Sequence, residues 1–138
     1  MEEKWAHRAD LAEAAINERH ASRVWGIPRT NLAVVSWPPA IEDKLFVQWH
    51  YWWQAHYLDC QIDAATRLPT NARKQRIKDT IRGIKIRNFG RFTRNSYYDD
   101  KLWLALALDR ARIHVLPGKT KKKYLRALEA VSYTNIRA

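Results

Sequence analysis

Two adjacent carboxylates, Asp99 and Asp100, follow two tyrosines, Tyr97 and Tyr98, and directly precede a strongly apolar run over residues 102–108. Removing an ionised carboxylate from water is costly, so carboxylates at the edge of an apolar segment usually have a specific task. Hydrolysis of a glycosidic bond needs two such groups, one as acid/base and the other as nucleophile or base. The pair therefore indicates either this chemistry or helix capping, since aspartate is also favoured at a helix N-terminus.

Aromatic side chains near the pair are suited to line a sugar-binding cleft, because each offers a large flat apolar surface with few rotatable bonds. Tyr97, Tyr98 and Trp103 flank the carboxylates, and Trp37 lies in a Trp-Pro-Pro loop before the next tryptophan-rich segment. If the helix that follows Trp37 and the helix that begins at the carboxylates run parallel, their N-termini meet at one mouth, and Trp37 then lines the same cleft as the carboxylate pair. The alternative is that Trp37 is a core residue of its loop.

The chain offers little for metal or thiol chemistry. Cys60 is the only cysteine, which excludes an intrachain disulfide and a cysteine-rich metal site. His50 and His56 lack the convergent ligand spacing of a metal site, and we interpret His50 and Gln54 as buried, hydrogen-bonded polar residues. We therefore expect neither a metal nor a cofactor.

Hydrophobic periodicity and Gly and Pro breaks predict helices and almost no strand. The expected helices span about 2–25, 42–66, 70–88, 99–115 and 119–131. Segments 42–66 and 99–115 are apolar nearly all round, a pattern typical of helices buried on all sides, whereas the other three have one polar face. The sequence therefore predicts an all-α protein with residues 1–138 in one domain.

The alternation of amphipathic and apolar helices favours a double-layered helical toroid whose inner helices are 42–66 and 99–115. About two and a half hairpins are too few to close a ring, so the inner helices would lack neighbours on one side. We expect self-association, a completing chain, or that residues 1–138 are the N-terminal part of a larger toroid. Large apolar patches rarely stay wet, so such a face should also bind a hydrophobic dye.

Charge is distributed unevenly along the chain. Residues 1–66 hold 6 Lys/Arg and 9 Asp/Glu, whereas residues 67–138 hold 19 Lys/Arg and 5 Asp/Glu. The densest stretch, Arg67–Arg94, indicates either a solvated helix face or a surface that binds polyanions. A noncatalytic glycan- or polyanion-binding module is thus the alternative function. A DNA-binding protein is disfavoured, since no short helix-turn-helix is visible.

The N-terminus and the apolar segments bear on localisation. No apolar stretch follows the charged start Met1-Glu2-Glu3-Lys4, so no secretory signal is expected and a cytoplasmic protein is predicted. The longest apolar helix contains His50, His56, Asp59 and Asp63, which argues against a membrane span.

The carboxylate segment resembles a known signature. The run Asn95-Ser96-Tyr97-Tyr98-Asp99-Asp100-Lys101-Leu102-Trp103-Leu104-Ala105-Leu106-Ala107 is similar to that of glycoside hydrolase family 76, the endo-α-1,6-mannanases. Further segments that resemble the actinobacterial branch are Trp37-Pro38-Pro39, Trp49–His56, Arg19-His20 and Val24–Pro28. The resemblance runs from about Trp5 to Arg112.

The resemblance implies an (α/α)6 toroid, retaining hydrolysis of α-1,6-linked mannan and no metal. Matched by position, Asp99 looks like the nucleophile and Asp100 like the acid/base. Four aromatic residues and one amide would shape the subsites: Trp37, Tyr97, Tyr98, Trp103 and Asn95. The chain departs from the family in stopping after about two and a half of six hairpins and in its basic second half, which puts the activity of the 138-residue chain in doubt.

Overall fold

The computed structural model describes residues 1–92, 95, 97–116 and 129, and within these the chain is mostly helical. The elements in chain order are α1 (Glu2–Arg19), β1 (Ala21–Ser22), the 3-10 turn η1 (Val24–Gly26), β2 (Leu32–Ala33), α2 (Ile41–Lys44), α3 (Tyr51–Arg67), α4 (Asn71–Arg87) and α5 (Tyr98–His114). β1 and β2 form one short antiparallel pair. The predicted all-α class is confirmed. The helix predicted at 119–131 lies outside the described residues except for Glu129.

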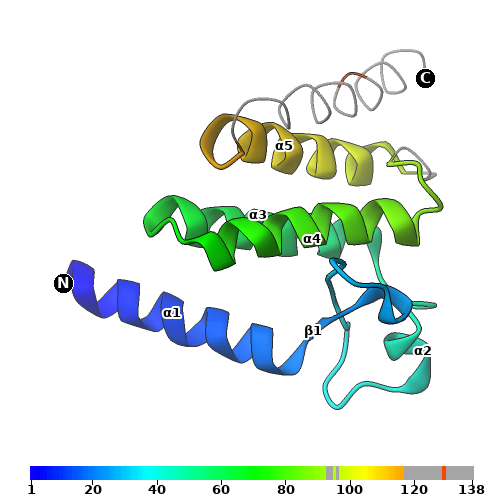
Figure 1. Cartoon of the computed structure of the whole chain (residues 1–138), viewed down its shortest axis with the longest axis horizontal. Coiled ribbons are helices and arrows are strands. Elements are labelled where there is room, and N and C mark those ends of the chain that lie inside the picture. The colour runs from blue at the N-terminus through cyan, green and yellow to red at the C-terminus, as the bar shows by residue number, and fades with distance from the viewer. Residues whose placement is uncertain (93–94, 96, 117–128, 130–138) are drawn as a thin grey trace.

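Helix α3 is the centre of the fold and packs against both α4 and α5 (Figure 1). It is joined to α4 by residues 68–70, so these two helices form an antiparallel hairpin. The core between the helices is formed by buried side chains that include Leu58, Ile62, Ile77, Ile81, Ile84, Leu104 and Leu108. Among the described residues, no helix has both the length and the apolar character that crossing a bilayer requires.

The bounds of α4 follow from local signals that the sequence displays. The Thr70 hydroxyl accepts a hydrogen bond from the backbone N–H of Arg73 (3.1 Å), as an N-cap should. At the other end, Gly90 adopts a left-handed φ of 83° and its N–H donates to the carbonyl of Lys85 (2.7 Å). The predicted span 70–88 therefore agrees with the observed helix to within one residue at each end.

The first helix ends earlier than the predicted residue 25, at Arg19. A buried turn replaces its last part: the Thr30 hydroxyl accepts from the Val24 N–H (2.9 Å) and donates to the Ile27 carbonyl (2.6 Å). Trp25 takes a left-handed φ of 51° in this turn, which a continuing right-handed α-helix does not accommodate. The prediction was wrong because a threonine outside the segment determines the turn.

The predicted helix 42–66 is also interrupted. The chain leaves α2 at Lys44 and enters α3 at Tyr51, with left-handed φ values of 55° at Phe46 and 47° at His50. The break lets Phe46 become fully buried. The Gln54 amide holds the chain there, since its Nε2 donates to the carbonyls of Trp49 (2.8 Å) and Ala33 (2.7 Å).

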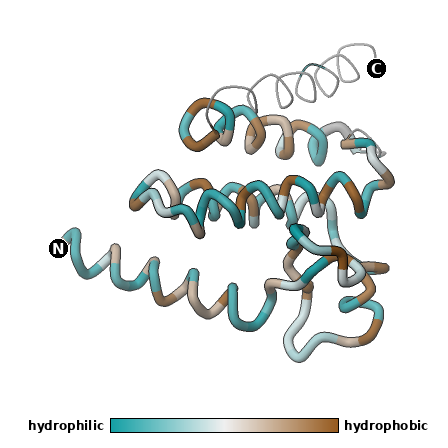
Figure 2. Tube along the Cα trace, in the orientation of Figure 1, coloured by the Kyte–Doolittle hydropathy of each residue, from teal (hydrophilic) through white to brown (hydrophobic). Residues whose placement is uncertain are grey.

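Helices α3 and α5 are not buried on all sides in this chain, as expected for inner helices that lack neighbours on one side. Each presents large apolar side chains to solvent, and along α5 Figure 2 shows hydrophobic and hydrophilic positions mixed. The exposed members on the two helices are Trp52, Trp53, Leu102, Trp103, Leu106 and Ile113. An ion-pair cluster ties this face together at its far end, where Arg110 binds Asp59 and Asp63. The apolar pattern predicted correctly that this face is hydrophobic, but it does not identify what would pack against it.

Candidate functional site

The first turn of α5 presents the two carboxylates. Tyr97 is the N-cap residue, and Asp99 and Asp100 follow within the first turn. Acidic side chains there interact favourably with the helix dipole, so both residues also stabilise the start of the helix. With Tyr97 as the N-cap residue, the first-turn position of both acids is one that the capping interpretation also predicts.

Asn95 positions the segment through two side-chain hydrogen bonds. Its Oδ1 accepts from the backbone N–H of Tyr97 (2.8 Å), and its Nδ2 donates to Oδ2 of Asp100 (3.0 Å). The second bond orients the half-buried Asp100 carboxylate, whereas Asp99 is exposed. The two neighbouring acids therefore lie in different environments.

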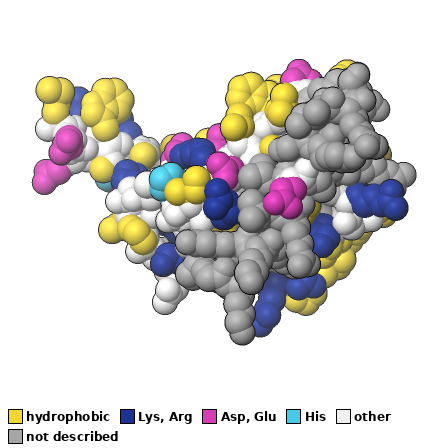
Figure 3. All heavy atoms as spheres, turned by 90° about the horizontal axis from the view of Figure 1, so that it is seen from above, with side chains coloured by type: hydrophobic (Ala, Val, Ile, Leu, Met, Phe, Trp, Pro, Cys, Tyr) yellow, Lys and Arg dark blue, Asp and Glu magenta, His cyan; other side chains and the backbone are white. Residues whose placement is uncertain are grey.

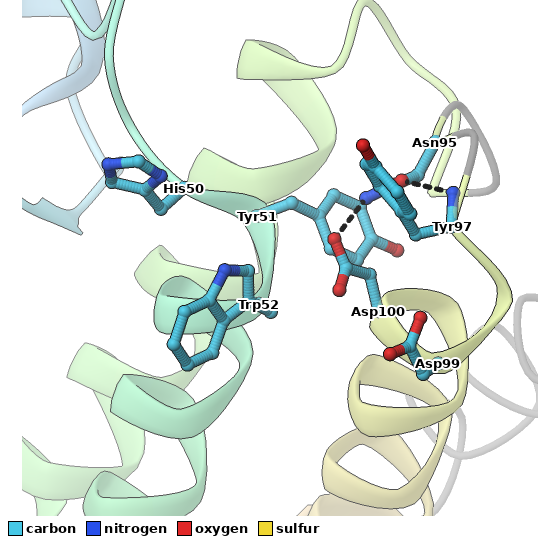
Figure 4. Close-up of a pocket in the computed structure, with 7 residues that line it drawn as sticks. All are labelled: His50, Tyr51, Trp52, Asn95, Tyr97, Asp99 and Asp100. Carbon is cyan, nitrogen blue, oxygen red and sulfur yellow. Dashed lines mark hydrogen bonds between the residues drawn. The ribbon is translucent and has the colours of Figure 1, made fainter.

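Both carboxylates line a pocket of about 400 Å³ between the N-terminal ends of α3 and α5 (Figure 4). Four lining residues come from the approach to α5 and its first turn: Asn95, Tyr97, Asp99 and Asp100. The other three, His50, Tyr51 and Trp52, come from the start of α3. The two helices thus run parallel and share one mouth, as the sequence argument predicted.

Tyr51 forms the buried wall of this pocket. Its hydroxyl donates a 2.6 Å hydrogen bond to the carbonyl of Phe92. Burial, and secondarily the negative charge of Asp100, raises the pKa of Tyr51 well above its ordinary value. The phenol therefore stays neutral and keeps its hydrogen bond throughout the physiological pH range.

The aromatic wall continues from the pocket along α3 and across to α5. The rings of Trp52 and His56 lie 6.0 Å apart, and those of His56 and Trp103 4.9 Å apart. Trp52 is 43% exposed and Trp103 45% exposed, so both present flat apolar surface to solvent. These rings form a continuous path from the carboxylates along the exposed face.

The sequence-predicted site residues divide into two groups. Asn95, Tyr97, Asp99 and Asp100 meet in the pocket. Trp103 lies one turn further along α5, outside the lining. Trp37 is 56% exposed, with its ring 6.3 Å from that of His20, and does not line the pocket. The side chain of Tyr98 lies outside the described part of the structure.

Sequence reasoning missed the contribution of His50, Tyr51 and Trp52. His50 is exposed, not buried as interpreted, because its left-handed backbone ends the loop before α3 and places the ring on the surface beside Trp53. Gln54, interpreted in the same way, is indeed buried and hydrogen-bonded. No sequence signal marked these residues, because the predicted helix began near residue 42 and placed residues 50–52 about two turns inside it, whereas α3 begins at Tyr51.

Comparisons with family models, curated proteins and solved structures find no match to this chain. Within the described ranges, no three His, Cys, Asp or Glu side chains lie close enough to hold a metal ion. The chemistry available in the pocket is therefore that of two carboxylates, one amide, one imidazole and three large aromatic side chains.

Proposed function

We propose that this chain carries the catalytic carboxylate pair of a retaining glycoside hydrolase acting on α-1,6-linked mannan. The observation that carries the proposal is that Asp99 and Asp100 line one pocket with the aromatic side chains of Tyr51, Trp52 and Tyr97. Two carboxyl groups at an aromatic pocket are what hydrolysis of a sugar polymer requires. The choice of mannan, and of retention, comes from the resemblance of the segment Asn95–Ala107.

The roles of the two acids follow from the resemblance and fit their surroundings. Asp99 attacks the anomeric carbon while the bond from that carbon to the leaving oxygen breaks, and Asp100 gives its proton to that oxygen. Water then attacks the same carbon, its proton passes to Asp100, and the Asp99 carboxylate is released. The exposed Asp99 is open to the substrate, and the Asn95 amide holds Asp100 in place.

The architecture we propose is part of an (α/α)6 toroid, with α3 and α5 as inner helices and α1 and α4 as outer ones. Two features support it: α3 and α5 lie parallel with a shared mouth, and α4 pairs with α3 as a hairpin. The exposed apolar face of α3 and α5 is where further inner helices would pack.

The first test is incubation of the 138-residue chain with linear α-1,6-mannan, together with its Asp99→Asn and Asp100→Asn variants. We expect oligosaccharide release by the wild type and loss of release in both variants, with circular dichroism unchanged. Asp109→Asn is the matched control, because Asp109 lies on α5, outside the pocket lining, and pairs with Arg112. Cleavage retained by both site variants contradicts the proposal, whereas no cleavage by the wild type shows that this chain alone does not form a working site.

A second test addresses the covalent step. A 2-deoxy-2-fluoro-mannosyl inactivator with a good leaving group should add one sugar to the wild type, and peptide mass spectrometry should locate it on Asp99. NMR should show α-configured product first, because retention regenerates the configuration of the substrate. Initial β-product would instead show inversion and contradict the assigned role of Asp99.

The alternative function, polyanion binding, is favoured by one specific observation on α4. Lys74, Lys78, Arg82 and Lys85 recur at a spacing that places them along one side of the helix. Among the described residues, none of these four forms an ion pair, whereas Arg67 and Arg73 are paired with α1. A row of basic side chains without carboxylate partners is suited to a sulfated or phosphorylated polymer.

The salt dependence of ligand binding distinguishes the two functions. Binding of heparin to the α4 row should weaken steeply with salt and should weaken further in Lys78→Ala/Arg82→Ala, because such affinity comes largely from charge neutralisation and counterion release. Arg23→Ala, which removes an exposed cation elsewhere, is the matched control. Mannan binding in the pocket should change little with salt or with either substitution. Salt-insensitive heparin binding would argue against the α4 row.

A further inference from the structure

Helix α1 turns its acidic side toward the rest of the protein. Nη2 of Arg67 lies 2.8 Å from Oδ1 of Asp10, and Nη2 of Arg73 lies 2.6 Å from Oε2 of Glu13. None of the residues of α1 is buried. The helix is therefore attached chiefly by ion pairs, and its N-terminal end protrudes from the molecule (Figures 1 and 3).

The centre of the apolar stripe of α1 lies about 100° around the helix from the midpoint of Asp10 and Glu13, so the stripe lies beside the ion-paired side. Trp5, Ala9, Ala12 and Ile16 are separated by four, three and four residues, which at 100° per residue keeps them within about 60° of one another. Trp5 is 61% exposed and Ile16 is 37% exposed. The part of the protein that packs beside α1 leaves Trp5 largely exposed and covers Ile16 only in part, although this stripe is the side most suited to burial.

We propose that the stripe binds the same stripe of a second copy, with the two α1 helices antiparallel about a two-fold axis level with Asp10 and Leu11. A two-fold interface must be self-complementary, and the stripe has that property: large, small, small, large in either direction. Trp5 of one copy packs on Ile16 of the partner subunit. At the centre, Ala9 faces Ala12 of the partner subunit, and these small side chains let the helices approach closely.

Charge selects the antiparallel orientation. Glu2 begins the helix and Arg19 ends it, so antiparallel pairing about this axis sets Glu2 level with Arg19 of the partner subunit and Glu3 level with Glu18 of the partner subunit. Parallel pairing would instead bring the acidic starts together and the Arg19 residues together. The helix holds five acidic and three basic residues, which disfavours an anionic membrane or a nucleic acid as the occupant of the stripe.

The length of the stripe limits the strength of the interaction. Eleven residues separate Trp5 from Ile16, about 16 Å along the helix, which is short for a stable interface. We therefore expect a weak dimer, seen as a rise in weight-average mass with concentration. Sedimentation equilibrium from about 10 μM to about 1 mM covers the range in which small interfaces of this kind associate.

The geometry is tested with cysteines. In a Cys60→Ser background, which removes the only native thiol, Ala9→Cys and Ala12→Cys chains of different mass are mixed and oxidised. Antiparallel pairing predicts that the mixed 9–12 disulfide forms faster than either like pair. Predominance of 9–9 and 12–12 disulfides would show parallel pairing and overturn the proposal, as would no cross-linking above that of a Ser22→Cys control.

Three glutamate substitutions locate the interface. Trp5→Glu should keep the chain monomeric up to the highest concentration, while circular dichroism stays unchanged because Trp5 is exposed. Leu11→Glu places the same charge on another side of α1, at a residue 57% exposed, and should leave association intact. Leu106→Glu tests the exposed α3–α5 face. A wild type that is monomeric throughout, or a dimer lost only in Leu106→Glu, overturns the proposal.

Discussion

Replacement of Gly83 by alanine should destabilise the protein, although alanine is the better helix former. Gly83 lies inside α4 where the helix meets the segment before β2, and an added Cβ would lie 2.4 Å from the carbonyl oxygen of Asn31. Ordinary contact needs about 1 Å more, so either α4 or the Asn31 backbone must move. The glycine is therefore required for a close approach and not for an unusual φ.

The neighbouring hydrogen bonds show that Asn31 cannot yield freely. Its backbone N–H donates to the Asp79 carbonyl (3.1 Å), and its Nδ2 donates to the hydroxyls of Thr80 (3.0 Å) and Tyr57 (3.0 Å). Overpacking of this kind costs about 1–3 kcal/mol, and the loss of one of these bonds about 1 kcal/mol more. The better helix propensity of alanine offsets about 1 kcal/mol of this loss. The net expectation is a loss of about 1–3 kcal/mol in the free energy of unfolding.

Urea unfolding followed by circular dichroism measures this loss, and a thermal scan should show a decrease of roughly 4 °C in Tm per kcal/mol. Lys78→Ala is the matched control, because it changes an exposed residue of the same helix and should have an effect within about 0.5 kcal/mol. If Gly83→Ala were as stable as the wild type or more stable, the close approach between α4 and Asn31 would be refuted.

Three further predictions concern ionisation and the exposed face. The pKa of Tyr51 is raised above its unfolded value of about 10, so this group should leave stability unchanged below pH 10 and lower it above pH 10, where the unfolded chain releases the proton first. Urea unfolding of Tyr51→Phe should lack this part of the alkaline loss of stability. Equal slopes of unfolding free energy against pH in the wild type and the variant would contradict the prediction. Burial, and after it the charges of Asp63 and Asp59, raises the pKa of the Cys60 thiol. Alkylation of the native chain by iodoacetamide at pH 8 should therefore be slower than alkylation of the urea-denatured chain, and it should be faster in native Asp63→Asn than in the native wild type. An unchanged rate in that variant would contradict the electrostatic cause. The exposed apolar side chains of α3 and α5 should bind anilinonaphthalene sulfonate in native buffer, and a native chain that leaves the dye's fluorescence unchanged would show that this face is covered.

The helices that the sequence predicted best are those bounded by local signals. Pro69 and Thr70 mark the start of α4, and Asn88 with Gly90 marks its end. The breaks at residues 20–25 and 45–50 were missed because each is held by hydrogen bonds to a residue outside the predicted helix. The Gln54 amide, for example, joins the start of α3 to Ala33, 21 residues earlier in the chain. Periodicity within one segment contains no information about such a partner.

About half of the candidate site was predicted from the sequence. The adjacency of Asp99 and Asp100, with Asn95 and Tyr97 beside them, gave one wall of the pocket, because residues close in sequence at a helix start stay close in space. The opposite wall depends on the packing of α3 against α5. Tyr51 belongs to that wall, and its contact with the Phe92 carbonyl spans 41 residues.

The two exposed apolar surfaces differ in the order of their side chains, and they therefore suit different partners. The α1 stripe has small residues at its centre and large ones at both ends, and it touches no polar pocket, so its own copy is its best complement. The α3–α5 face has no such symmetry: it begins at the carboxylates, continues through Trp52 and Trp103, and ends at the Arg110 ion pairs. The α1 stripe is therefore suited to assembly with its own copy, whereas the proposed toroid places further inner helices on the α3–α5 face, beside the pocket that would bind the glycan.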